Sequence, residues 1–576
     1  LLESSLSLAE EDLTLNDAGA WVPAKDGDKV RARAGAPYFH TASGERKATG
    51  SYFTPKIVVD HLIERSIVPA LSAHLEKVSA NLNAGDASAA AREFFDFRVA
   101  DLAMGSGHFL VAAVDKIEAL MRDFLTEHSV PGVTEELLRL AAVARDALGT
   151  DDVAKSEVDE IGLLRRQVAR RCIYGLDINP MAVELARLAL WIHTFVPGLP
   201  MSNLDHGLVC ANSLTGIGTI DEALDALQPK RKPGALSLFD QILTDELASS
   251  KTLLIDVANA SEANKAEVEE SARLLVQARE AADTARRIFD AAVAARMGEI
   301  NPGVIYDEDS LSQVLDLPQV EETAGRLRSA HLPFLFPEVF LRDATGFDVL
   351  LGNPPWEKLH VEEHQWWGLR LPGLRSLPTK ERDAALSAFR ASRPDLEAEY
   401  QAEIERMSAM SQAVSSGPYA GVGAAHLDLY QAFAWRNWQL LGSSGRAAIV
   451  LPRGALSGSA LAEWRRTVLK EGSFADVCFI ENTGRWAFDM EPRYTIGLTV
   501  TEKGGDQVVC WAGPFASEKE FRAGAGDLAE VPGDEFAAWS NTAAFPLIPD
   551  PVSAEVFRQM KRNPRFDTVR AGFSQV

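Results

Sequence analysis

Short apolar runs that end in turn-forming residues recur along the chain and alternate with segments of helical periodicity. Residues 97–117 and 172–192 each read as a strand, a turn and an amphipathic helix. Further short apolar runs lie at 208–214, 347–355 and 446–452. Strands that alternate with helices are typical of a parallel sheet covered on both faces. The pattern therefore predicts an α/β fold built on a doubly wound, mainly parallel sheet.

The end of this pattern differs from the rest. Apolar runs at 477–483 and 494–502 follow each other closely, which predicts an antiparallel pair of strands. After about residue 511 the character of the chain changes, and the stretch GAGDLAEVPGDEF is typical of a linker. We expect residues 511–576 to contain this linker and the start of another domain.

Two long helical segments interrupt the alternation. The first spans 221–330 and includes residues 266–297, whose Ala, Glu and Arg content predicts a long helix or a helical hairpin. The second spans 357–425 and contains Trp366 and Trp367. We expect packing or solvated roles for these helices. For the two tryptophans we favour packing in a core over stacking on nucleic-acid bases.

Composition excludes several classes of protein. The chain has 576 residues, of which 46% are hydrophobic and 24% charged, as in ordinary globular proteins of several domains. Its net charge of −24 argues against a broad nucleic-acid-binding surface on this part of the protein. A local basic channel, or a basic domain outside this sequence, stays compatible with that charge. The chain begins with Leu1 and not Met, so we expect a piece of a longer protein.

Cysteine spacing and hydropathy bear on location. The four cysteines lie far apart without any CxxC pair, so the sequence predicts neither a metal site nor a disulfide framework. No apolar run approaches the roughly 18 residues needed to span a bilayer, and no signal peptide opens the chain. We expect a cytoplasmic location and no membrane partner.

Polar residues follow the first two predicted strands. Gly105, Ser106 and Gly107 lie between strand and helix, where glycines let a ligand approach the backbone and a helix amino end favours an anion. Asp177 ends the next strand, where a carboxylate can accept bonds from both ribose hydroxyls of a nucleoside. Alone, the glycine turn could be structural and Asp177 a helix cap. Together they favour a nucleoside-containing cofactor at the carboxyl edge of the sheet.

The stretch LLGNPPW, residues 350–356, carries the most chemical information. Asn353 offers an amide oxygen, and the carbonyl of Pro354 is a second acceptor held by rigid backbone. Two acceptors that converge suit an exocyclic amino group, which has two hydrogens to donate. Trp356 offers a ring face for a base taken out of its stack. A rigid turn beside a buried tryptophan is the simpler reading of NPP when it stands alone.

In this order the motifs resemble N6-adenine DNA methyltransferases of the gamma arrangement, which use S-adenosylmethionine. The resemblance covers roughly residues 45–510 and implies a Rossmann-like class I methyltransferase fold with long helical insertions. The matching stretches are GSYFTPKIVVDHLI (50–63), DLAMGSGHFL (101–110), YGLDINP (174–180), CANSL (210–214), LLGNPPW (350–356), HLDLYQAFAWRNWQLL (426–441) and GRAAIVLP (445–452).

TGSYFTP and FPEVF (336–340) more closely resemble the large methyltransferases of type IIG restriction–modification enzymes and of the BREX and DISARM phage-defence systems. Double-stranded DNA is the implied partner, with other restriction or defence subunits as further partners. The implied domains are an N-terminal extension (1–45), a cofactor-binding half (46–220), a helical insertion (221–330), a catalytic half (331–510) containing the insertion 357–425, and a linker with the start of a target-recognition domain (511–576).

The resemblance also implies residue roles. On the cofactor side, Thr54 is expected at the methionine carboxylate, Asp177 at the ribose and Asn212 at the adenine amino group. On the acceptor side, Asn353 and the Pro354 carbonyl would orient the target amino group while Trp356 stacks on the flipped adenine. The cofactor set is Thr54, Asp101, Gly105, Ser106, Gly107, Asp177 and Asn212; the catalytic set is Asn353, Pro354, Pro355, Trp356 and, as a second aromatic preferred over Trp486, Phe488.

Two alternatives stay open at this stage. GNPP also occurs in methyltransferases of RNA and of protein glutamine, so the acceptor nitrogen could belong to either. A non-catalytic defence subunit that binds cofactor or DNA is the second alternative, although the intact GNPPW stretch argues against it. The sequence has no convincing PD…(D/E)xK stretch of a nuclease.

Overall fold

A computed structural model shows the chain as two compact units, which comprise Leu1–Phe53 with His360–Met407, and Thr54–Leu359 with Ser408–Val576. The structure describes residues 5–8, 13–15, 21–23, 33, 37–40, 54–149, 155–156, 158–229, 238–260, 262–303, 305, 307–371, 374, 377–422, 428–488, 492–548 and 550–562.

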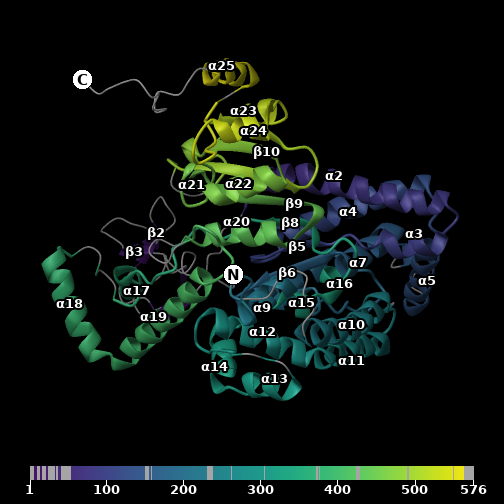
Figure 1. Ribbon diagram of the computed structural model, residues 1–576, viewed down its shortest axis with the longest axis horizontal. Coiled ribbons are helices and arrows are strands. Elements are labelled where there is room, and N and C mark those ends of the chain that lie inside the picture. Colours follow the sequence, from purple (N-terminus) through teal and green to yellow (C-terminus); the bar gives the residue numbers. More distant parts are fainter. Residues whose placement is uncertain are drawn as a thin grey trace. The chain divides into compact units, whose positions relative to one another are not determined.

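The larger unit is built on a nine-stranded sheet with the order β13-β12-β10-β11-β9-β8-β5-β6-β7 (Figure 1). Its strands are β5 (Val99–Asp101), β6 (Ile173–Asp177), β7 (Leu208–Cys210), β8 (Phe347–Gly352), β9 (Leu441–Pro452), β10 (Gly472–Glu481), β11 (Thr495–Lys503), β12 (Val508–Phe515) and β13 (Ala529–Pro532).

The pairing directions divide the sheet. The neighbours β7, β6, β5, β8 and β9 all run parallel. β11 is antiparallel to β9 and to β10, while β12 is parallel to β10 and β13 antiparallel to β12. The α/β class and the late antiparallel pair are confirmed. The sheet as a whole is mixed, so a doubly wound parallel arrangement does not describe all of it. The described residues between β10 and β11 contain no α-helix, and strands without a crossover helix pair antiparallel.

The strand order turns at β5, which lies between β6 on one side and β8 on the other. These three strands end at Asp101, Asp177 and Gly352. Because they are parallel, their carboxyl ends open at the same edge of the sheet, where ligands bind in folds of this kind.

Both faces of the parallel strands are buried. α2 (Lys56–Asn83) and α4 (His108–Glu127) share one apolar cluster with Val349 and Leu351 of β8. Leu350, which points to the opposite face, is equally buried. Strands covered on both faces carry continuous apolar runs, which explains why they were readable in the sequence.

The remaining helices connect these strands or pack around them. They are α3 (Ala87–Phe94), α5 (Pro131–Ala147), α7 (Glu160–Arg171), α8 (Pro180–His193), α20 (Leu429–Leu440), α21 (Arg453–Ser457), α22 (Ala462–Glu471), the 3-10 turn η3 (Thr483–Arg485), α23 (Glu518–Gly524), α24 (Gly533–Ala538) and α25 (Pro551–Lys561). No helix among the described residues is both long and apolar enough to cross a membrane.

The first insertion forms its own apolar core. The predicted helix over 266–297 is two helices that meet at Ala282, and the packing role is confirmed because α12 is buried along most of its length. The fully buried Arg436 of α20 ties the insertion to the sheet by an ion pair with Glu222 (2.8 Å). The helices are α9 (Ile220–Leu227), α10 (Leu238–Asn259), α11 (Lys265–Ala281), α12 (Asp283–Arg296), α13 (Glu308–Leu315), α14 (Pro318–Leu327), α15 (Leu332–Leu335) and α16 (Pro337–Phe340).

Residues 508–532 add β12 and β13 to the same sheet, where the sequence analysis expected a linker to begin at 511. The run VVCWAGPF has strand character, and Val509 and Trp511 are buried in the sheet. A target-recognition domain beyond these strands stays a prediction.

The smaller unit pairs β1 (Ser5–Leu8) with β4 (Pro37–His40), and β2 (Leu13–Leu15) with β3 (Trp21–Pro23). It also contains α17 (Glu363–Gly368), α18 (Thr379–Ser392) and the first part of α19 (Pro394–Ser415). Trp367 is fully buried in a small core with Tyr400, and Trp366 packs against it. Core packing of the two tryptophans is therefore confirmed.

Candidate active site

Polar residues from distant parts of the sequence meet at the carboxyl edge of β5, β6 and β8. Asp101, Asp177 and Gly352 are the last residues of these strands, and Asn353 follows directly. All the residues proposed from the sequence for cofactor and acceptor lie in the larger unit and are described.

Asp177 holds the loop that follows β5. Its Oδ2 accepts a hydrogen bond from the backbone N–H of Gly105 (2.9 Å), and its Oδ1 accepts one from Asn179 (2.8 Å). Asn179, and not Asp177, is the N-cap of α8. The helix-cap reading of Asp177 is thus wrong. Its half-buried carboxylate joins two strand ends and keeps free acceptor capacity toward solvent.

The two loop glycines have different roles. Both have positive φ, +54° at Gly105 and +80° at Gly107, where other residues are strained. A Cβ at Gly107 would lie 3.1 Å from the Cβ of Ala186, so this glycine lets α4 and α8 approach each other. A Cβ at Gly105 would meet nothing within 4 Å, and the neighbouring Ser106 is exposed. The loop therefore presents open backbone at Gly105 and Ser106.

Asp101 is a buried carboxyl group with an unusual acidity. Its Oδ1 accepts a bond from the N–H of Ala103 (2.9 Å). Burial is the main cause that raises the pKa of Asp101 to about 7; the Ala103 bond opposes this change and the charge of Asp177 adds to it. The group therefore changes charge near neutral pH.

Gly352 lies directly against this carboxyl group. Its φ is +147°, and a Cβ there would come within 2.7 Å of Asp101 Oδ1. Only glycine fits this backbone and this contact. The residue before Asn353 is therefore positioned by the end of β5.

The GNPPW segment also contacts the start of α2. The side-chain Nδ2 of Asn353 donates to the Oγ1 of the buried Thr54 (3.2 Å). This bond uses the amide nitrogen and turns the amide oxygen, Oδ1, away from Thr54. Pro354 is buried and Pro355 half-buried, so the backbone after Asn353 is held on both sides.

Aromatic side chains follow. Trp356 is half-buried, and its Nε1 donates to the carbonyl of Val450 (3.4 Å). Phe488 is 6% exposed and packs in the main core, with its backbone held by two bonds to the Asn482 amide. Tyr494 is 49% exposed, and its ring centroid lies 6.5 Å from that of Trp356. The sequence analysis preferred Phe488 and did not single out Tyr494, because side-chain exposure cannot be read from this motif.

Asn212 follows the end of β7 and is buried. Its Oδ1 accepts a bond from the N–H of Leu214 (3.1 Å), and its backbone forms a bridge with Ser329. The neighbouring Ser213 donates to the carbonyl of Leu102 after β5 (2.8 Å). The segment is thus fixed beside the residues that follow β5.

Two further residues at this edge carried no signal in the sequence. Ile178 follows Asp177 and is 44% exposed, which is unusual for a large apolar residue next to a carboxylate. Cys210 pairs with Asp177 in the strand register and is exposed, with its Sγ 3.7 Å from the carbonyl of Ile178. Both residues therefore expose side-chain surface beside Asp177.

Among the described residues, one cluster of side chains that could bind a metal lies away from this edge of the sheet. His61, Asp476 and Cys478 place ligand atoms within 4.8 Å of one another, although the cysteine spacing predicted no such group. Asp476 already pairs with His61 (3.3 Å) and with Arg65 (3.2 Å), and burial raises the pKa of the Cys478 thiol well above its ordinary value. We interpret the cluster as a buried link between α2 and β10.

Residues 171–371 match the model of the Eco57I restriction-modification methylase family. This segment includes β6, the helical insertion and GNPPW. A type II restriction enzyme and methyltransferase of Methanocaldococcus jannaschii is 22% identical over 54% of this chain. The chain spans 28% of the length of that relative. Both comparisons support a restriction–modification methyltransferase.

Solved structures add distant similarities. A DrdV–DNA complex overlaps 83% of this chain and 29% of its own, with 11% identity and a TM-score of 0.35. The ATP-dependent type ISP enzyme LlaBIII bound to DNA overlaps 80% of this chain and 20% of its own, with 11% identity and a TM-score of 0.32. TM-scores below 0.5 do not establish a common fold.

The contact between Gly352 and Asp101 predicts a specific cost for a side chain. Gly352→Ala should lower the free energy of unfolding, through backbone strain of about 1 to 3 kcal/mol and the added clash with Asp101. Gly85→Ala is the matched control, because Gly85 also has positive φ (+79°) but nothing within 4 Å of its Cβ position.

Urea unfolding followed by tryptophan fluorescence measures both changes. In an Asp101→Ala background the cost of Gly352→Ala should fall toward that of Gly85→Ala. An equal cost for both glycines in the native background would show that the Asp101 contact does not constrain the segment.

Proposed function

We propose that this chain is the catalytic body of an S-adenosylmethionine-dependent methyltransferase that methylates adenine N6 in DNA by base flipping, in a restriction–modification or phage-defence system. The observation that carries the proposal is the pair of contacts Asn353–Thr54 and Gly352–Asp101. They join the segment proposed for the acceptor amine to both segments proposed for the methionine end of the cofactor.

The residues at the strand ends fit the cofactor chemically. The half-buried Asp177 offers acceptors to the two ribose hydroxyls, and the open backbone at Gly105 and Ser106 leaves room for the ligand. Thr54 would bind the methionine carboxylate, and Asp101 would lie toward the cationic groups of the methionine end. When bound, S-adenosylmethionine supplies an electrophilic methyl group on a sulfonium.

The adenine end of the cofactor would lie beyond Asp177. We assign the exposed Ile178 to an apolar contact with the adenine ring, because its exposed surface lies next to the ribose acceptor. The amide oxygen of Asn212 would accept a hydrogen bond from the adenine amino group. Its Oδ1 already accepts one bond from Leu214 and has one lone pair left.

On the acceptor side, the Asn353 Oδ1 and the Pro354 carbonyl would accept the two amino hydrogens of a flipped adenine. This positions the nitrogen lone pair and raises its electron density without a general base, and the proton leaves to water afterwards. Trp356 would stack on one face of the base. For the other face the sequence proposes Phe488, while Tyr494 is the more exposed aromatic and lies near Trp356.

Cofactor binding can be tested by calorimetry with S-adenosylmethionine. The wild-type chain should bind one equivalent, and Asp177→Ala should weaken binding at least about tenfold, since it removes both ribose acceptors. A thiol reagent gives a second readout, because Cys210 is exposed at the site while Cys172 and Cys478 are buried. The ligand should slow labelling of Cys210 but not of Cys510. Unchanged Cys210 labelling despite binding would place the ligand elsewhere.

The pKa of Asp101 predicts the pH dependence of this affinity. Because the pKa is raised to about 7, the carboxylate gains its charge between pH 6 and 8, and S-adenosylmethionine affinity should rise about tenfold over that window. In the ligand-free protein the raised pKa favours the neutral form in the folded state, so stability should fall as the pH rises from about 4 to about 7 and then level off. The pKa of the nearby His108 is lowered by burial, so its charge contributes little here.

Calorimetry at pH 6, 7 and 8 measures the effect. S-adenosylhomocysteine, which has no sulfonium charge, should show a weaker dependence, and Asp101→Asn should abolish it. A pH dependence that survives in Asp101→Asn would assign the titrating group to another residue.

The acceptor role of Asn353 predicts a separation of binding from catalysis. Asn353→Ala should reduce methyl transfer to adenine-containing DNA by at least about 100-fold, because an acceptor for the reacting amine is lost. S-adenosylmethionine affinity should change by less than about threefold. Asn301→Ala, on the exposed surface of the insertion, is the control.

Radiolabelled methyl transfer followed by nucleoside digestion identifies the product. Label in RNA or in glutamine, and none in DNA, would support those alternatives instead. Loss of both transfer and binding in Asn353→Ala would mean that the acceptor site is misplaced.

A further inference from the structure

A polar cavity lies at the opposite ends of the same parallel strands from the candidate active site. Its volume is about 620 Å³, within the range of small-molecule sites. Arg98 precedes β5, Arg171 precedes β6 and Gly207 precedes β7, so these residues line it from the amino ends of the strands. The helices α3, α5, α7 and α10 supply other parts of its wall. The cavity is therefore separate from the candidate active site.

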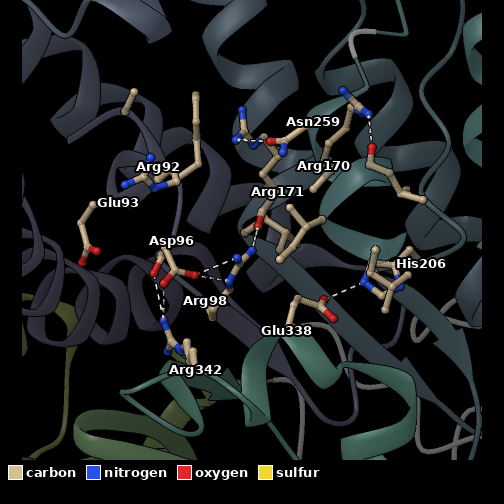
Figure 2. A pocket seen from close by; sticks show the side chains of 18 of the residues that line it. Arg92, Glu93, Asp96, Arg98, Arg170, Arg171, His206, Asn259, Glu338 and Arg342 are labelled. Atoms are coloured by element: carbon tan, nitrogen blue, oxygen red, sulfur yellow. Dashed lines mark hydrogen bonds and ion pairs between the residues drawn. The ribbon is translucent and has the colours of Figure 1, made fainter. Parts of the chain in front are cut away.

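The lining carries more positive than negative charge, although the whole chain has a net charge of −24. Figure 2 shows charged side chains that line the cavity, among them Arg92, Arg98 and Arg171. The cations are Arg92, Arg98, Arg170, Arg171, Lys251 and Arg342; the carboxylates are Glu93, Asp96, Glu136 and Glu338.

Most carboxylates are already neutralised by partners inside the protein. Asp96 pairs with Arg98 (2.8 Å) and more loosely with Arg342 (3.7 Å). Glu338 accepts bonds from Tyr174 (2.9 Å) and His206 (2.6 Å). The dashed lines of Figure 2 mark the first two pairs and the bond from His206. These bonds hold the side chains of Asp96 and Glu338 in the wall of the cavity.

Two cations of the lining, Arg92 and Lys251, are not paired with a carboxylate among the described residues. Among the described residues, Arg92 donates to the hydroxyl of Ser88 (2.6 Å) and Lys251 to the carbonyl of Leu341 (2.7 Å), and neither forms an ion pair. Arg92 is exposed and Lys251 half-buried. Each keeps donors for an anionic ligand that enters the cavity.

The wall also has an apolar part. Ile255 is 42% exposed and lies near the buried Leu254 and Val257 of α10. The guanidinium of Arg171 lies over the ring of Phe95, 4.3 Å from its centroid, and forms a flat part of the wall that pairs with Glu136 (3.3 Å). A flat heteroaromatic ring can stack on such a surface.

We propose that this cavity binds a free nucleotide, with Arg92 and Lys251 holding its phosphates and the Arg171–Ile255 wall its base. The volume exceeds what a single phosphate would fill. A DNA duplex is a poorer match, because duplex binding depends on many phosphate contacts and only two unpaired cations are present here. The inference does not depend on methyl transfer.

Calorimetric titration of the chain with ATP in magnesium-free buffer tests the site. The wild type should bind one equivalent, and the double variant Arg92→Glu, Lys251→Glu should bind at least tenfold more weakly. Arg522→Glu reverses an exposed arginine on α23 and should leave the affinity unchanged within about twofold. Circular dichroism and thermal unfolding check that the variants fold.

Further titrations locate the bound nucleotide. Asp177→Ala should bind ATP like the wild type, whereas weaker binding would place the adenosine in the candidate active site and overturn the proposal. Pyrophosphate should bind less tightly than ATP, and equal affinity would overturn the role of the apolar wall. No saturable binding by folded wild type at millimolar ATP, or unchanged affinity in the double variant, would also overturn it.

Discussion

The contact between the Asp101 carboxyl group and the backbone of Gly352 sets the geometry of the carboxyl edge of the sheet. It joins the ends of two neighbouring parallel strands that are about 250 residues apart in the chain, and it needs a glycine with positive φ. Asp177 adds the third strand through its bond to Gly105. Asp101 thus positions the segment of Gly352 and Asn353, and Asn353 in turn bonds to Thr54. Asp177 positions the loop at Gly105 and Ser106.

Burial of Asp101 makes ionisation of its carboxyl group unfavourable. A carboxyl group in an apolar setting resists ionisation, and its pKa of about 7 shows that the folded protein keeps it partly neutral at physiological pH. Such a group is costly unless a cation comes close. Titratable groups of this kind are enriched at functional sites, which agrees with its place between the two proposed ligand segments.

Much of the fold could be predicted because the parallel strands are buried on both faces and therefore read as continuous apolar runs. The positions of Asp101, Asp177 and Asn353 at the edge of the sheet were predictable since each ends or follows such a run. The bond between Asn353 and Thr54 crosses 299 positions, and no local pattern carries that information. The strands β12 and β13 were missed because Gly and Pro in and around them resemble a linker. Tyr494 was not singled out beside Phe488, since the difference in their exposure arises from packing against distant core residues.

The length of β5 has a mechanical consequence. The strand contains three residues, so Arg98 at one end and Asp101 at the other are separated by about 10 Å of extended backbone. A strand this short has no middle section in which a small displacement along its axis could be absorbed. A displacement of Arg98 along the strand axis would reach Asp101 and the glycine beside it through only three residues of backbone.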